Sequence, residues 1–296
     1  MHMSFVETFT IPLAEQITGN KKTYRLVQDA AEIGNFLMRA DSESYQIRPV
    51  LRSSLLRRAK RLWDREKYLE IYYNAGHYYE MQDDVLTALE LYEKSGNKNR
   101  IRELLIRNAE KNPGNGHYFT LRKYYLSLTE EEIETDAVLM SGMSMLYSLL
   151  LKPEESEYWY DRLCKYETEQ SGGIKREAKS RIAYLDIALP HRGTVGILEL
   201  MKDIPTLLFD DGITLPEFSV TTNLPSVMNG GKDFSEWSRK DRQIAGTMGK
   251  VVATVLGRYG KGLVQIALAE SQYEKGGDTY EILSLLGKGS LEAEAG

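Results

Sequence analysis

Apolar side chains recur at helical spacing over most of this chain of 296 residues. Leu51, Leu55 and Ala59 share one helix face after Pro49, and proline favours the first turn of a helix. The same periodicity, interrupted by short connections rich in Gly, Asn or Pro, predicts a series of further helices. Their expected ranges are 65–80, 83–95, 98–111, 116–127, 136–151, 154–169, 175–188, 194–209, 236–257 and 259–275. Helices joined by such short loops pack as antiparallel neighbours.

The pattern before Pro49 is different. Residues 12–18 and 22–34 are expected to form two short helices that are separated at Gly19, because glycine tolerates the left-handed conformation that ends a helix. In residues 35–48 an apolar run and an alternating run flank a turn-like segment, which predicts a β-hairpin. Two helices followed by a hairpin are typical of the end of a winged-helix module, and residues 4–50 are predicted to form one.

Small and large residues recur at fixed spacings in the helical part. The first helix of one pair carries Tyr72, Gly76 and Tyr79, and the second carries Ala88, Tyr92 and Ser95. This order is that of a tetratricopeptide (TPR) repeat, in which small residues let two helices cross and aromatic rings fill the seam between them. Arg100 stands where such a repeat would have proline.

The same spacings return 68 residues later, which is twice the 34-residue period of such repeats. The second set consists of Ser144, Tyr147, Ser156, Tyr160 and Leu163. We therefore predict a mainly α protein: a winged-helix-like N-terminal module with a small β-hairpin, followed over residues 51–296 by an antiparallel helical-repeat (TPR-like) superhelix. An ordinary helical bundle with chance spacing is the alternative.

Composition narrows the functional classes. The 38 basic and 43 acidic side chains give a net charge of −5, whereas a nucleic-acid-binding surface needs a basic excess. No apolar run is long enough to cross a membrane, so no membrane contact is expected. The single cysteine, Cys164, cannot form an internal disulfide, and a reducing, cytoplasmic location fits best. We expect Cys164 to be a buried structural thiol.

Motifs for catalysis or metal binding are missing from the sequence. None of the four Gly-Lys pairs has the spacing of a phosphate-binding P-loop, and the four histidines are far apart without paired-ligand spacing. Two carboxylate clusters, 130–132 and 154–155, fall in the first turns of expected helices, where acidic side chains complement the helix dipole. The sequence therefore predicts no enzyme activity and no metal site.

Two segments remain without an assigned role. The stretch from Arg48 to Lys67 holds eight positive and two negative residues, so it could touch nucleic acid, phosphate or an acidic domain, or be a solvated helix face. A long irregular stretch, 210–233, interrupts the helices. A loop of that length is either functional or a surface excursion that covers the neighbouring helices.

Three sets of residues resemble one family, the large ATP-binding transcriptional regulators of the LuxR type. These are Phe9-Thr10-Ile11-Pro12-Leu13-Ala14-Glu15-Gln16-Ile17-Thr18-Gly19, the hairpin ending Tyr45-Gln46-Ile47-Arg48-Pro49, and the arginine-rich helix followed by TPR-like repeats. The segment 215–235 also resembles such regulators. The chain shows neither the Walker-type ATPase that precedes this region in the family nor the helix-turn-helix that follows it, so it resembles the central part alone.

The resemblance implies a regulatory sensor and interaction domain. Its partners would be a small-molecule inducer or a regulatory protein, with an intramolecular contact to the ATPase and self-association as a further option. No cofactor is expected in this segment, because ATP would bind the missing ATPase, and DNA binding would belong to the missing C-terminal part.

Binding would use a tyrosine-rich groove of the superhelix. The candidate groove residues are Tyr72, Tyr73, Tyr78 and Tyr79, followed by the loop residues Asn223, Asn229 and Asp233. Two other functions are weighed: a free-standing TPR-like scaffold for protein–protein interaction, and a helical hydrolase using the loop 210–233. The hydrolase lacks a histidine near Asp233 and Ser235.

Overall fold

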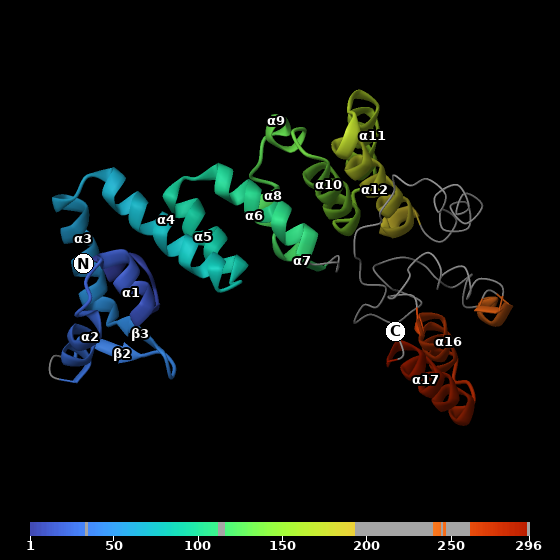
Figure 1. The fold of residues 1–296 in the computed structure, drawn as a ribbon, viewed down its shortest axis with the longest axis horizontal. Helices are drawn as coiled ribbons and strands as arrows, with labels where there is room; N and C mark the ends of the chain where they lie inside the picture. Colours follow the sequence, from blue (N-terminus) through green and yellow to red (C-terminus); the bar gives the residue numbers. More distant parts are fainter. Residues whose placement is uncertain (33–34, 112–115, 193–238, 244, 247–260, 295–296) are drawn as a thin grey trace. The chain divides into compact units, whose positions relative to one another are not determined.

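The computed structural model describes residues 1–32, 35–111, 116–192, 239–243, 245–246 and 261–294. This part of the chain is mainly helical and has one small antiparallel sheet of three strands (Figure 1). It divides into two compact units, Met1–Asn108 and Ala109–Gly296. None of its helices is both long and apolar enough to cross a membrane.

The first unit begins with a small mixed module. Its elements are η1 (His2–Phe5), β1 (Phe9–Thr10), α1 (Ile11–Thr18), α2 (Thr23–Glu32), β2 (Leu37–Arg39) and β3 (Ser44–Ile47). The predicted hairpin is confirmed, because Leu37 pairs with Ile47 and Arg39 with Tyr45. The sequence did not predict β1, which adds a third strand on the other side of β3. The predicted helix end at Gly19 is also confirmed, with a φ of +63°.

This module shares its core with the helices that follow. Buried Phe9, Leu13 and Tyr45 cluster with Ala75 of α4 (Arg65–Met81) and Leu91 of α5 (Val85–Ser95). The boundary expected near residue 50 therefore lies inside the first compact unit, since both sides of it contribute to one apolar core.

The remaining helices of the first unit are α3 (Pro49–Leu62) and the first part of α6 (Lys98–Lys111). Helices α4 and α5 form the first predicted repeat pair and lie side by side (Figure 1). They cross where predicted: the fully buried ring of Tyr92 lies against Gly76. Helix α5 begins two residues later than expected because the Asp84 side chain accepts a hydrogen bond from the amide of Thr87 and caps the helix.

The second unit begins with three short helices, which are followed by three longer ones. These are α7 (Gly116–Thr120), α8 (Arg122–Tyr125), α9 (Glu130–Ile133), α10 (Ala137–Leu149), α11 (Pro153–Glu169) and α12 (Gly172–Ala188), followed by η2 (Pro190–Arg192). The single helix expected over 116–127 is wrong, because the backbone leaves helical geometry at Leu121. Helices α10 and α11 form the second predicted pair, and Ser156 donates a hydrogen bond to the carbonyl of Ser144 where they cross.

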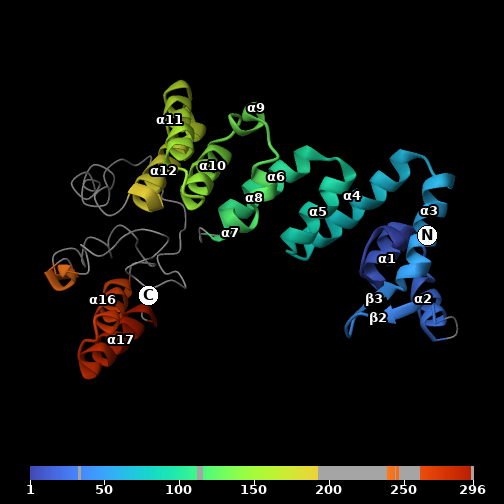
Figure 2. The ribbon, with the colours of Figure 1, turned by 180° about the vertical axis from the view of Figure 1, so that it is seen from behind.

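The described chain ends with the pair α16 (Leu263–Glu274) and α17 (Thr279–Glu294), which lie side by side in both views (Figure 2). The sequence predicted α16 within 259–275 and missed α17. The two helices approach closely because Gly262 and Gly289 face each other, and a Cβ on Gly262 would lie 2.1 Å from the carbonyl oxygen of Gly289. The predicted helices at 194–209 and over most of 236–257 lie outside the described residues, as does the stretch 210–233.

Candidate functional site

The tyrosines proposed from the sequence pack mostly inside the first unit. Tyr72 lies edge-on against Phe5, with ring centroids 5.5 Å apart. The Tyr78 hydroxyl lies 2.8 Å from the Thr10 hydroxyl, and the Tyr79 hydroxyl donates to the carbonyl of Thr8 at 3.1 Å. These three side chains are partly buried and join α4 to the N-terminal module. A ligand could reach only the parts of these side chains that remain exposed.

Tyr73 lies on another side of the same helix. Its ring centroid is 5.8 Å from that of Tyr92, at the α4–α5 seam. The loop candidates Asn223, Asn229 and Asp233 lie outside the described residues, so their role stays a prediction. The structure thus brings Tyr78 and Tyr79 into contact with each other and keeps Tyr73 apart from both.

A groove opens in the second unit, beside the helix pair α10–α11. Its volume is about 540 Å³, which is within the range of ligand pockets. It is lined from α8–α9 by Leu126, Leu128, Glu130 and Ile133, and from α10–α11 by Met143, Tyr147, Glu154, Glu155, Tyr158 and Trp159. Leu126 and Tyr158 are 47% and 40% exposed, so apolar surface is open to solvent at its rim.

Carboxylates give the groove a negative rim. Glu130 stands in the first turn of α9, which a capping box fixes: the Thr129 hydroxyl accepts the Glu132 amide hydrogen bond, and the Glu132 carboxylate accepts that of Thr129. Glu154 and Glu155 stand in the first turn of α11. The predicted helix-terminal placement of both acidic clusters is confirmed. The same placement turns three carboxylates toward one groove.

Two aromatic residues of α11 line the groove beside these carboxylates. Trp159 is buried, and Tyr158 packs edge-on against it with centroids 5.3 Å apart. The guanidinium of Arg162 lies 5.1 Å from the centre of the Tyr158 ring and donates to the Tyr158 hydroxyl at 2.7 Å. The groove therefore combines an aromatic surface with negative charge, a combination that attracts cations.

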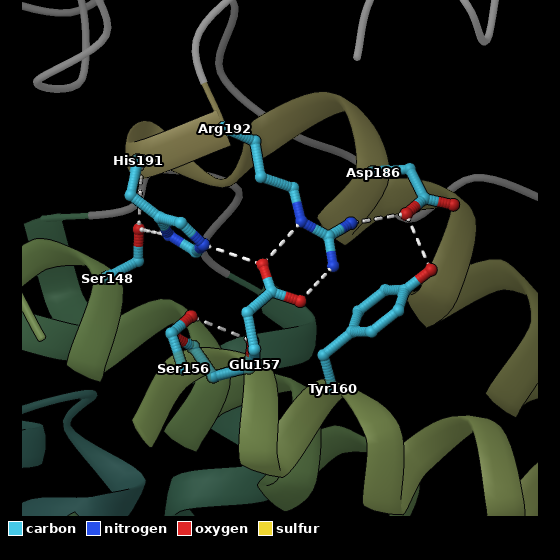
Figure 3. A network of polar contacts seen from close by, with 8 residues as sticks. Ser148, Ser156, Glu157, Tyr160, Asp186, His191 and Arg192 are labelled. Carbon is cyan, nitrogen blue, oxygen red and sulfur yellow. Dashed lines mark hydrogen bonds and ion pairs between the residues drawn. The ribbon is translucent and has the colours of Figure 1, made fainter. Parts of the chain in front are cut away.

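A polar network lies on the same two helices, around Glu157 (Figure 3). The carboxylate of Glu157 lies between two residues of η2: its Oε1 is 2.6 Å from His191 Nε2 and accepts from Arg192 Nε at 2.7 Å. Arg192 also donates to Asp186 at 2.7 Å, and Tyr160 donates to the same Asp186 oxygen. Hydrogen bonds from Arg192 lower the pKa of Glu157, against an opposing effect of burial.

This network holds η2 against α10 and α11. His191 Nδ1 lies 2.8 Å from the Ser148 hydroxyl, which also accepts the His191 backbone amide at 3.3 Å. Because an ionised Glu157 can only accept, His191 donates from Nε2. Serine, histidine and glutamate thus follow one another as in a hydrolase triad. The Ser148 side chain is fully buried, however, and Arg192 also binds the Glu157 carboxylate. The arrangement therefore stabilises the packing of η2 on α10 and α11 (Figure 3).

A second charged cluster lies in the first unit. The Glu80 side chain is only 3% exposed, and its carboxylate accepts hydrogen bonds from Tyr92, Arg100 and Arg107. Burial alone would raise the pKa of Glu80, but these hydrogen bonds and the two guanidinium charges lower it. Burial and the Glu80 carboxylate raise the pKa of Tyr92. The Glu80 carboxylate thus joins α4 to Tyr92 of α5 and to two arginines of α6, so the cluster stabilises the packing of these helices.

The sequence did not predict the groove, because its lining comes from three helices, α9, α10 and α11, and from the residues between α8 and α9. One signal in the sequence could have indicated the groove: two acidic first helical turns lie close in sequence to the aromatic residues Tyr147, Tyr158 and Trp159. Among the described residues, no group of three or more histidine, cysteine, aspartate or glutamate side chains is arranged to hold a metal ion. Cys164 was expected to be buried and is partly buried, and this burial raises the pKa of its thiol.

Comparisons of this chain with family models, curated proteins and solved structures found no match.

Proposed function

We propose that this chain is the sensor and interaction domain of a LuxR-type transcriptional regulator, and that it binds its inducer or partner protein in the groove between α8–α9 and α10–α11. The observation that carries the binding role is the groove itself: about 540 Å³, aromatic, acidic at its rim and open to solvent. The regulator assignment rests on the resemblance of the N-terminal segment, the hairpin ending and the order of the repeats.

Binding would act by selecting one arrangement of the helices that line the groove. A ligand shifts a conformational equilibrium only by the difference in its affinity for the two states. The groove offers such a difference, because one of its walls can move more easily than the other. Helix α9, which contributes Glu130 and Ile133, has only four residues, whereas α10 and α11 are long. Movement of α9 would change the groove and leave the repeat pair intact.

A thermal-shift screen of the chain against small molecules and candidate proteins tests the binding role. Tyr158→Ala, at the groove rim, should abolish the shift that a bound compound produces. Tyr280→Ala removes an exposed tyrosine of α17 and should leave the shift unchanged. Tyr73→Ala and Tyr78→Ala test the earlier assignment to α4, and loss of binding in these variants alone would place the site there.

The reading frame around this segment tests the regulator assignment separately. A P-loop upstream and a helix-turn-helix downstream would support it. A start codon near Met3 and a stop codon near Gly296 would favour the alternative, a free-standing TPR-like scaffold for protein–protein interaction.

A further inference from the structure

Helix α3 carries a basic face that the proposed function does not use. Arg57, Arg58, Lys60 and Arg61 are exposed, and none of them forms an ion pair within the described part of the chain. Arg57 and Arg58 lie four and three positions before Arg61, so all three side chains lie within one broad face of the helix. Val50 lies on the same face two turns earlier and is 83% exposed. This surface is amphipathic and strongly positive.

The groove of the second unit has the opposite charge. Glu154 has no partner within the described part of the chain, and Glu130 has only a long contact of 3.4 Å with the Tyr158 hydroxyl. Glu155 pairs with Lys152 at 3.3 Å, where both side chains are about half exposed. The exposed Leu126 supplies apolar surface beside these carboxylates.

The protein already uses the chemistry that would join these two surfaces. Arg192 lies 3.9 Å from the centre of the Tyr160 ring while it pairs with Glu157. Arg162 covers the ring of Tyr158 while it pairs with Glu134. A guanidinium that stacks on an aromatic ring and pairs with a carboxylate is thus a recurring contact in this unit. The groove offers carboxylates of the same kind, Glu130 and Glu154, to arginines from outside.

We propose that the acidic groove binds the basic face of α3 from a second copy of this chain. Arginines of α3 would pair with Glu130 and Glu154, and Val50 would meet the apolar rim at Leu126. The inference rests on the proposed role of the groove as an interaction site, and it names a partner for that site. One helix in a groove of this size buries less area than a stable dimer requires, so the association is weak and sensitive to salt.

Sedimentation velocity over a range of concentrations, at low and at high salt, tests the inference with the full chain. The unmodified chain should associate reversibly as its concentration rises, and high salt should weaken this association. Arg57→Glu/Arg58→Glu and, separately, Glu154→Lys/Glu155→Lys should each weaken it about tenfold, because each places like charges opposite one another. Lys21→Glu/Lys22→Glu makes the same charge change on exposed lysines between α1 and α2 and should have no effect.

A mixture of the two reversed variants gives the decisive result. Each variant alone should associate about tenfold more weakly than the unmodified chain, whereas their equimolar mixture should associate more strongly than either alone. In the mixture, the unmodified α3 of one variant matches the unmodified groove of the other, and the two reversed surfaces also match. An unmodified chain that stays monomeric at all concentrations overturns the inference. Association that none of the reversals changes also overturns it. In either case, ligand binding that Tyr158→Ala abolishes would leave the proposed function standing.

Discussion

The ring of Tyr92 lies 2.9 Å from the position that a Cβ on Gly76 would occupy. This contact explains why the α4–α5 pair needs glycine at that position: the two helices approach closely there, and the aromatic ring fills the space. The fully buried ring is also fixed at its far end, where its hydroxyl donates to Glu80. Tyr92 therefore has little freedom to move away from a larger side chain.

Gly76→Ala should consequently destabilise the protein, although alanine favours helix more than glycine does. Overpacking of this kind costs about 1–3 kcal/mol, which exceeds the roughly 1 kcal/mol gained in helix propensity. The control is Gly287→Ala in α17, where nothing lies within 4 Å of the added methyl group, and which should raise stability. Chemical denaturation of both variants checks the prediction. A gain in stability for Gly76→Ala would contradict the close contact.

Glu80→Gln should destabilise the first unit by about 3 kcal/mol, because it leaves Arg100 and Arg107 without their shared buried carboxylate. The effect lies near the lower end for buried pairs, since 44% of the Arg107 side chain remains exposed. Glu103→Gln removes another partner of Arg100, but that carboxylate is half exposed, so the expected cost is below about 1 kcal/mol. Equal losses in the two variants would refute the importance of the buried cluster.

Thr129→Ala should loosen α9 and with it one wall of the groove. The substitution removes the hydroxyl half of the capping box and costs about 1 kcal/mol. Thr129→Ser retains the hydroxyl and serves as the control. Faster hydrogen exchange of the Glu132 amide in the alanine variant, with normal exchange in the serine variant, is the expected observation. Unchanged exchange in both variants would show that the cap does not hold this helix.

Acid should unfold the chain partly through Glu80 and Glu157. Both carboxyls have a pKa below their ordinary value of 4.5 in the folded protein. Their contribution to stability is therefore complete above about pH 4.5 and is lost as the pH falls through the lower, folded pKa. Glu80 should dominate, because 39% of the Glu157 side chain is exposed and its ion pairs are screened. Denaturation midpoints measured between pH 7 and pH 3 should fall less steeply in Glu80→Gln.

Local sequence signals predicted the local structure well. The hairpin followed from alternation around a turn, and both helix pairs, α4–α5 and α10–α11, followed from small residues at Gly76 and Ser156, because helix crossings admit little else. The exact end of a helix depends on capping side chains such as Asp84. Periodicity alone placed the start of α5 two residues too early. Strand β1 was too short to show any period.

Contacts between distant positions could not be predicted in the same way. The sequence showed Arg100 only as a departure from the repeat pattern. In the structure its guanidinium pairs with the carboxylate of Glu80, twenty residues earlier. Arg192 pairs with Glu157 across 35 residues, from a turn that no helical period describes. The groove depends on two acidic helix ends that were each explained by their own helix dipole. Their convergence is a property of packing, which the spacing of residues along the chain does not encode.

The place of Leu91 in the N-terminal core has a consequence for protein synthesis. Phe9 and Leu13 find their complete surroundings only when α5 has been made, because Leu91 and Ala75 belong to the same cluster. At ordinary translation speeds roughly 4–16 s separate the synthesis of Phe9 from that of Leu91. During that interval the first strand and helix leave the ribosome with apolar side chains uncovered. The N-terminal module described here is thus translated before α5, but it completes its core only after residue 91 has emerged.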